Sequence, residues 1–357
     1  GALLADGIGD TVRVSLTEDP EAEMPVAQKL VNYIQERQGH QPIVGELAPG
    51  YDPIACLKRK TRGVEKIGSD FLPVVISDRA QGDFEFNYEA MPDFIYIGQE
   101  NPENLPDTFR LLVDAQFWKP RPNAFPYFIA SEAEEMKSYE SPLKFIRLTY
   151  PDLTDDILEI LRKDKTVVVV LSTHRRNGLG EQRAAMHRLM KAGVDVPVIL
   201  HREYNEADIE SVQLKSAADL GALLLDGFGN GIMLHDDAVP AQILDQTMFG
   251  ILQAAKVRIS KTEYISCPSC GRTLYDLQTT IARIKEATSH LKGLKIGIMG
   301  CIVNGPGEMA DADYGYVGAG RNQISLYKGK ECLVKNIPEE EAVERLVQLI
   351  KDNGDWK

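Results

Sequence analysis

The sequence has little of what membrane proteins, nucleic-acid-binding proteins and secreted disulfide-rich proteins need. It contains no run of 18 apolar residues and no signal peptide, so we predict no membrane segment. Acidic residues outnumber basic ones by 53 to 40, and a net charge of −13 leaves no basic stripe to neutralise nucleic-acid phosphates. Five cysteines in 357 residues are sparse and odd in number, which argues against a disulfide scaffold. We expect a reduced, intracellular protein of two domains.

Three of these cysteines and one glutamate form the most informative pattern. Cys267-Pro-Ser-Cys270 is followed by Cys301 and, seven residues later, by Glu308. Soft thiolates select zinc or iron–sulfur clusters, and an electron-transfer ferredoxin normally closes its cluster with a fourth cysteine. Three thiolates leave one iron with a weaker, replaceable ligand, which favours catalysis at a cluster. Spacing alone leaves a structural zinc site, a redox dithiol and inert thiols open.

The residues around these cysteines predict a compact α+β module. The run 295–300 is typical of a buried strand that delivers Cys301 at its C-terminal end, and Asn304–Gly307 is typical of a tight turn that brings Glu308 back toward Cys301. We interpret Cys56 and Cys332 as structural. Apolar spacing predicts a helix over 273–291, strands over 314–317, 324–327 and 332–337, and a last helix over 339–351.

The strings 261–278 and 298–313, above all Gly300-Cys-Ile-Val-Asn-Gly-Pro-Gly-Glu308, closely resemble the cluster domain of the 4-hydroxy-3-methylbut-2-enyl diphosphate synthases, the IspG or GcpE family. The resemblance runs from near Arg258 to the C-terminus and again over residues 1–20. It implies an enzyme of isoprenoid biosynthesis that opens 2-C-methyl-D-erythritol 2,4-cyclodiphosphate by two-electron reduction with loss of water. It also implies ferredoxin or flavodoxin as electron donor and a cytoplasmic location, or the plastid stroma for a plant protein.

The resemblance also assigns roles to single residues. It implies a [4Fe–4S] cluster whose irons are held by three thiolates and one carboxylate, those of Cys267, Cys270, Cys301 and Glu308. Glu308 would yield its iron to a substrate oxygen, and Asn304 would hydrogen-bond the substrate. Arg13 and Ser15, in a strand expected over 11–16, match residues that bind the substrate diphosphate. The chain would then be an iron–sulfur oxidoreductase; a non-enzymatic zinc-binding adaptor and an electron-transfer module remain the alternatives.

An internal repeat indicates the larger architecture. Gly1–Gly9 recurs as Gly221–Gly229 with seven identities in nine positions, an offset of 220 (221 − 1), and Pro20 falls on Pro240. Solenoid repeats are only ~20–50 residues long, whereas this offset suits a (β/α)₈ barrel of ~250 residues. Eight candidate strands separated by helical stretches predict such a barrel, with a doubly wound open sheet as the alternative; they cover 42–46, 71–77, 94–98, 125–130, 144–150, 166–172, 196–201 and 231–235.

We therefore predict three parts in an α/β chain. Residues 1–39 would be the last βα unit of a catalytic barrel that this chain mostly lacks, 40–258 an inserted barrel, and 259–357 the cluster domain. This matches the larger, three-domain form of the family found in plants and some bacteria. Met233 and His235 stand where the first copy has Arg13 and Ser15, so we interpret the insert as a spacer and expect the chain alone to be inactive. Polar clusters at 172–177 and 201–202 leave ligand binding by the insert open.

Overall fold

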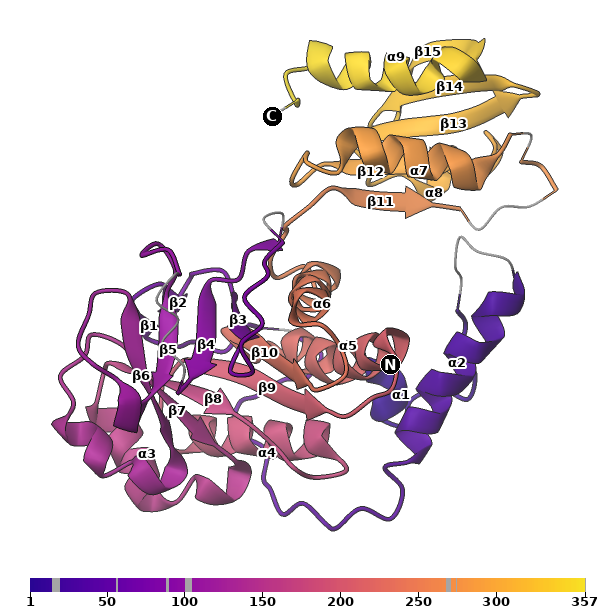
Figure 1. Cartoon of the computed structure of the whole chain (residues 1–357). Helices are drawn as coiled ribbons and strands as arrows, with labels where there is room; N and C mark the ends of the chain where they lie inside the picture. The colour runs from indigo at the N-terminus through magenta and orange to yellow at the C-terminus, as the bar shows by residue number, and fades with distance from the viewer. Residues whose placement is uncertain are drawn as a thin grey trace. The chain divides into compact units, whose positions relative to one another are not determined.

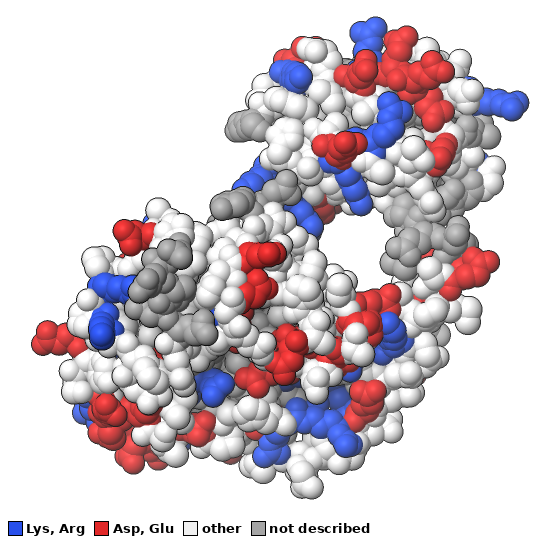
Figure 2. Space-filling model, viewed as in Figure 1, with Lys and Arg blue, Asp and Glu red and all other residues white. Residues whose placement is uncertain are grey.

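The computed structural model describes residues 1–14, 20–55, 57–87, 90–99, 105–267, 271–273 and 275–356. The chain divides into two compact units, the first of residues 1–10 and 29–258 and the second of residues 11–28 and 259–357 (Figure 1). None of the described helices is long and apolar enough to cross a membrane. On the face that Figure 2 shows, Lys and Arg side chains lie scattered among Asp and Glu rather than in a continuous stripe.

The first unit contains a closed barrel of eight parallel strands, in the order β10-β3-β4-β5-β6-β7-β8-β9. Strand β10 pairs with both β9 and β3 and so closes the barrel, which confirms the barrel over the open sheet. All five residues of β8 are buried, as expected of a parallel strand covered on both faces. The strands are β3 (Val74–Asp78), β4 (Phe94–Gly98), β5 (Leu111–Asp114), β6 (Ala124–Ile129), β7 (Lys144–Leu148), β8 (Val167–Leu171), β9 (Val198–Tyr204) and β10 (Gly231–Asp236).

One predicted strand is wrong. Residues 42–46 have no regular secondary structure. The barrel reaches eight strands through β5 instead, which was not predicted from the sequence. Pro42 lacks the N–H that a strand interior requires, and Val44 is 83% exposed. Strand β5 is only four residues long, too short for its apolar period to stand out. The short antiparallel pair β1 (Gly63–Val64) and β2 (Ile67–Gly68) adds Val64 and Ile67 to the core inside the barrel.

Helices alternate with strands only in the second half of the barrel. Helices α3 (Asp155–Lys163), α4 (Gly178–Lys191), α5 (Ile209–Leu225) and α6 (Ala241–Ala254) follow β7, β8, β9 and β10. Among the described residues between β3 and β7, the connections hold only 3₁₀ turns. Bulky side chains cover the outer face of β4–β6 instead, so helices are not needed there to bury it; they are Phe84, Phe86, Leu105, Phe109 and Trp118.

The sequence repeat is also a structural repeat. Helix α1 (Ala2–Ala5) and the end of α5 finish with the same hydrogen bonds, and Gly7 and Gly227 both take left-handed φ angles, of 73° and 82°. This is the Schellman helix ending, which favours glycine. The bonds run from Asp6 N to Ala2 O, Gly7 N to Leu4 O and Ile8 N to Leu3 O, and again from Asp226 N to Ala222 O, Gly227 N to Leu224 O and Phe228 N to Leu223 O.

The two copies lie against each other but differ in burial. A Cβ on Gly1 would lie 2.8 Å from Ala218 Cβ, so α1 approaches α5 closely. The Arg183 guanidinium forms ion pairs with Asp6 and Asp226, the same residue of each copy. Leu223 and Phe228 are buried in the barrel (0% and 2% exposed), whereas their counterparts Leu3 and Ile8 are 66% and 59% exposed. The two copies therefore share one backbone conformation, whereas the burial of their side chains depends on the elements that pack against each copy.

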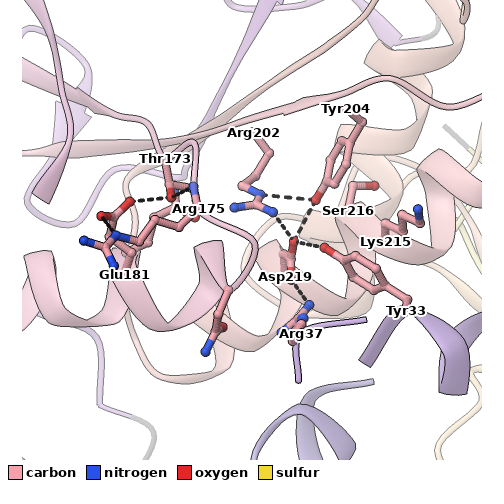
Figure 3. A network of polar contacts seen from close by, with 12 residues as sticks. Tyr33, Arg37, Thr173, Arg175, Glu181, Arg202, Tyr204, Lys215, Ser216 and Asp219 are labelled. Carbon is pink, nitrogen blue, oxygen red and sulfur yellow. Dashed lines mark hydrogen bonds and ion pairs between the residues drawn. The ribbon is translucent and has the colours of Figure 1, made fainter. Parts of the chain in front are cut away.

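A buried polar network joins the helix α2 (Pro20–Gln35) and the residues after it to α5 (Figure 3). Its centre is the Asp219 carboxylate, which is 0% exposed. The hydroxyl of Tyr33 donates to it at 2.5 Å, and that of Tyr204 at 3.0 Å. The guanidinium of Arg202 lies 2.7 Å away, and that of Arg37 binds the other carboxylate oxygen. Residues 33–37 are thus fixed to the barrel by one carboxylate.

The second unit is an α+β module built on a five-stranded sheet in the order β11-β12-β13-β14-β15. The first three strands run parallel and the last two pair antiparallel. Helices α7 (Leu277–Thr288) and α9 (Glu339–Asp352) share one core with the sheet, in which Ala342, Leu346 and Ile350 are fully buried as predicted. The strands are β11 (Glu263–Ser266), β12 (Lys295–Met299), β13 (Tyr314–Gly320), β14 (Gln323–Lys328) and β15 (Glu331–Pro338).

Candidate functional site

Two of the predicted metal ligands lie at the same edge of this sheet. Strands β11 and β12 are parallel neighbours, with Ser266 paired to Ile298, so Cys267 and Cys301 follow the C-terminal ends of adjacent strands. The N–H of Gly300 donates to the Sγ of Cys267 over 3.1 Å. Both thiols are half-buried and neither is in a disulfide. Cys270 lies outside the described residues.

The end of β12 is packed tightly by residues that follow the Cys-x-x-Cys pair. A Cβ on Gly300 would lie 2.3 Å from Thr273 Oγ1, and one on Gly318 would lie 2.3 Å from the Gly300 carbonyl oxygen. The hydroxyl of Tyr275 donates to the carbonyl of Met299 at 3.0 Å. Burial, and then the nearby charge of Tyr316, Cys267 and Cys301, raise the pKa of Tyr275 well above its usual range. Tyr275 is thus a neutral neighbour of both thiols.

The segment after Cys301 contains a short helix where a tight turn was predicted. Helix α8 (Gly305–Glu308) follows Asn304, whose carbonyl accepts from the N–H groups of Gly307 and Glu308. Neither glycine of this helix takes a left-handed φ angle. Gly305 is required for packing instead, since a Cβ there would lie 2.6 Å from the Cβ of Met299. Proline is tolerated in the first turn of a helix, so Pro306 allows this structure. The side chains of Asn304 and Glu308 are exposed.

The described part of the chain places two thiols but does not assemble a full ligand set. Within that part, no three His, Cys, Asp or Glu side chains lie close enough together to hold a metal ion. Cys267 and Cys301 nevertheless fit as thiolate ligands of a cluster. They are free, share one sheet edge, and one sulfur accepts a backbone N–H, a contact that stabilises a charged sulfur and tunes cluster potentials.

The strand predicted over residues 11–16, with its diphosphate ligands, is not formed over the described residues 11–14. Thr11–Val14 have no regular secondary structure, Arg13 is exposed, and Ser15 lies outside the described residues. A strand needs a neighbour to pair with. The barrel offers none, because β3–β10 close on themselves and leave no free edge.

The corresponding positions of the second copy are occupied differently. Met233 lies in the core inside the barrel, 1% exposed. His235 is 3.0 Å from Asp78 Oδ2 and 3.1 Å from Asp237 Oδ1. Its contact with Asp78 is the main reason why its pKa is raised to about 9. His235 is therefore a protonated partner of two carboxylates at neutral pH.

The polar clusters of the insert, 172–177 and 201–202, are largely paired within the protein (Figure 3). Thr173 and Arg175 both bind the buried carboxylate of Glu181, and Arg202 binds that of Asp219. Ser172 Oγ lies 2.6 Å from His201 Nδ1. Arg175 and Arg202 are thus used as structural partners, which favours a structural role for these clusters over a ligand site. These ion pairs could not be predicted from the sequence, because the two carboxylates lie on other elements, Glu181 on α4 and Asp219 on α5.

Comparisons with known proteins find one matching family model and several similar proteins that share a name. Residues 263–352 match the family model described as the GcpE protein C-terminal domain. Over its whole length the chain is 75% identical to the 4-hydroxy-3-methylbut-2-en-1-yl diphosphate synthase (flavodoxin) of Parabacteroides distasonis, of which it covers 58%. It is 54% identical to the protein of that name from Phocaeicola vulgatus, and 38% to that from Akkermansia muciniphila, covering 58% and 55% of their lengths. The chain therefore spans little more than half of these relatives, and the resemblance seen in the sequence is confirmed.

Proposed function

We propose that this chain is the C-terminal portion of a 4-hydroxy-3-methylbut-2-enyl diphosphate synthase of the three-domain form. The whole protein would reduce 2-C-methyl-D-erythritol 2,4-cyclodiphosphate by two electrons, open its ring and release water. The observation that carries the proposal is the position of Cys267 and Cys301 after adjacent parallel strands, with the Gly300 N–H on the Cys267 sulfur. Flavodoxin, which the relatives' names give for those proteins, is the proposed electron donor, and ferredoxin is the alternative.

We propose that Cys267, Cys270, Cys301 and Glu308 hold a [4Fe–4S] cluster. When bound, such a cluster supplies single electrons and an iron that accepts an oxygen ligand. The chain's own residues prepare the site. Cys267 and Cys301 follow two neighbouring strands of one sheet, and α8 carries the exposed residue Glu308 three positions after Gly305. A carboxylate is a harder and weaker partner for cluster iron than a thiolate, so Glu308 is suited to give way to substrate. Asn304, exposed beside it, would hydrogen-bond the substrate.

For the domain organisation, we propose that residues 1–39 are the last βα unit of an upstream catalytic barrel and that 40–258 form an inserted spacer. The repeated helix ending supports this, because Leu223 and Phe228, which the barrel buries in the second copy, correspond to the exposed Leu3 and Ile8 in the first. The longer relatives have additional chain that could supply those strands. Arg13 and Ser15 would then bind the diphosphate only within that barrel, so we expect the present chain to have no synthase activity of its own.

Two other functions would use the same thiols without catalysis. A zinc-binding adaptor predicts stoichiometric zinc and no labile sulfide, and an electron-transfer module predicts a cluster that cycles without binding a diphosphate. The exposed carboxylate of Glu308, seven residues after Cys301, favours the enzyme, because a purely structural or electron-transfer site is normally completed by cysteine or histidine.

Reconstitution under anaerobic conditions with iron and sulfide tests the cofactor. We expect about four irons per chain, and their loss in Cys301→Ser. Cys332→Ser is the matched control, since Cys332 is a half-buried cysteine of the same sheet whose sulfur faces the Val334 carbonyl. Stoichiometric zinc with negligible iron would contradict the proposal, as would equal iron loss in both variants.

A further inference from the structure

The resemblance gives no role to Tyr275, yet this residue contacts both sides of the thiol-bearing edge. Its hydroxyl donates to the carbonyl of Met299, two residues before Cys301, at 3.0 Å. Its ring belongs to the same apolar cluster as Cys267, and packs edge-on against Tyr316 with the ring centres 5.8 Å apart. One side chain thus connects the segment after the Cys-x-x-Cys pair to the strand that carries the third cysteine.

The surrounding backbone is shaped to admit this ring. A Cβ on Gly318 would lie 3.0 Å from Tyr275 Cε1 and 2.3 Å from the carbonyl oxygen of Gly300. Any larger residue at 318 would push the ring away or separate β13 from the end of β12. The N–H of Gly300 is the group that donates to the Cys267 sulfur. The ring of Tyr275, the backbone of Gly300 and the sulfur of Cys267 therefore form one packed unit.

A phenol in this position acts on charged sulfur in two ways. Its apolar ring packs against the same apolar cluster as Cys267, a position that limits the access of water to that sulfur, and solvent exposure is one of the factors that set the potential of a cluster. Its hydroxyl fixes the main chain that leads to Cys301, as hydrogen bonds outside the ligand shell do for metal ligands generally.

We propose that Tyr275 is a positioning residue of the thiolate site: its hydroxyl holds the backbone before Cys301, and its ring shields the edge formed by Cys267 and Cys301 from water. The effect on a cluster rests on the proposed function, because it requires that these thiolates hold one. The shielding itself can be measured on the thiols alone.

Three variants of the full chain separate the contributions. Tyr275→Phe removes the hydroxyl bond and keeps the ring, and Tyr275→Leu removes the ring and keeps an apolar side chain. Tyr314→Phe is the matched control: Tyr314 is a buried tyrosine of the same sheet whose hydroxyl donates to Asp355 at 2.6 Å. Circular dichroism and thermal unfolding verify that each variant is folded.

The first measurement is the alkylation rate of Cys267 and Cys301 in the metal-free chain, followed by peptide mass spectrometry. We expect both to react several-fold faster in Tyr275→Leu and at the wild-type rate in Tyr314→Phe. The second is the half-life in air of the reconstituted chromophore, with the midpoint potential from a redox titration. We expect an about ten-fold shorter half-life in Tyr275→Leu, a more positive potential, and a smaller change in Tyr275→Phe.

The outcomes distinguish the two proposals. If the wild-type chain binds no cluster but its thiols react faster in Tyr275→Leu, the shielding stands and the proposed cofactor is overturned. If a cluster forms and neither its half-life, its potential nor the thiol rates respond to Tyr275→Leu, the cofactor stands and the role of Tyr275 is overturned. Equal changes in Tyr314→Phe would overturn it as well, since they would reflect a general loss of stability.

Discussion

Replacing Asp219 by Asn should strongly destabilise the barrel unit. The Asp219 carboxylate is fully buried and lies between two guanidinium groups, of Arg37 and Arg202, whose side chains are each 8% exposed. Asn has nearly the same shape but no charge, so two buried cations would lose the counter-charge that they share. Removing one partner of a buried ion pair costs about 3–5 kcal/mol, because the remaining charge stays desolvated. We expect a loss of this size in the free energy of unfolding.

Urea unfolding followed by tryptophan fluorescence measures this loss. The chain has two tryptophans, and only Trp118 lies in the barrel unit, where its Nε1 donates to the Ala124 carbonyl at 2.9 Å. Measurements in a Trp356→Phe background therefore report the barrel alone. Asp208→Asn is the control, because Asp208 pairs with Lys29 at the surface and asparagine caps a helix as well as aspartate does. If Asp219→Asn lost no more stability than this control, the reasoning would be refuted.

Three further predictions concern other named contacts. His235→Gln should lower the free energy of unfolding by roughly 3 kcal/mol at most at pH 6, because the pKa of His235 rises to about 9 on folding. The difference in unfolding free energy from the wild type should vanish as the pH rises through 9. A difference that does not change with pH would contradict this prediction. Gly305→Ala should cost the second unit about 1–3 kcal/mol by overpacking against Met299, while Gly307→Ala, with no atom within 4 Å of the new Cβ, should not; equal melting temperatures would be the contrary result. Glu308→Ala should leave a cluster with one labile iron but no turnover in the full-length enzyme, and wild-type turnover would remove Glu308 from the mechanism.

The barrel could be predicted largely because its strands are continuous apolar runs. Strand β8, Val167-Val-Val-Val-Leu171, is unmistakable in the sequence and fully buried in the structure. Strand β5 was missed because its four residues carry no period, and 42–46 were mistaken for a strand although Pro42 cannot donate to a ladder. Helices were expected between all strands, but aromatic side chains cover β4–β6 instead. Whether helices or aromatic side chains cover a strand depends on tertiary packing, so it cannot be recognised from the local sequence.

The site shows the same division between local and non-local information. Cysteine spacing and the Gly-Pro-Gly string are local, and they indicated the thiols. The roles of Gly300 and Gly305 are not local, since both are required by side chains that approach from elsewhere in the unit. Tyr275 was visible in the resembling string, but its partner carbonyl is that of Met299, 24 residues away. An aromatic residue five positions after Cys270 is a weak signal until the strand order places Met299 beside it.

The two copies of the repeat agree with the proposal that the barrel of residues 40–258 is a spacer. The helix ending depends on glycines at left-handed positions, and both copies keep them. The groups at the strand end are not needed for that geometry, so they are free to change. In the second copy one position became the apolar Met233 of the core, and the other became His235, which now pairs with Asp78. Met233 and His235 both make contacts within the barrel, at the positions where the first copy has Arg13 and Ser15, the proposed diphosphate ligands. A spacer gains stability from such changes, whereas a diphosphate site would lose its donors.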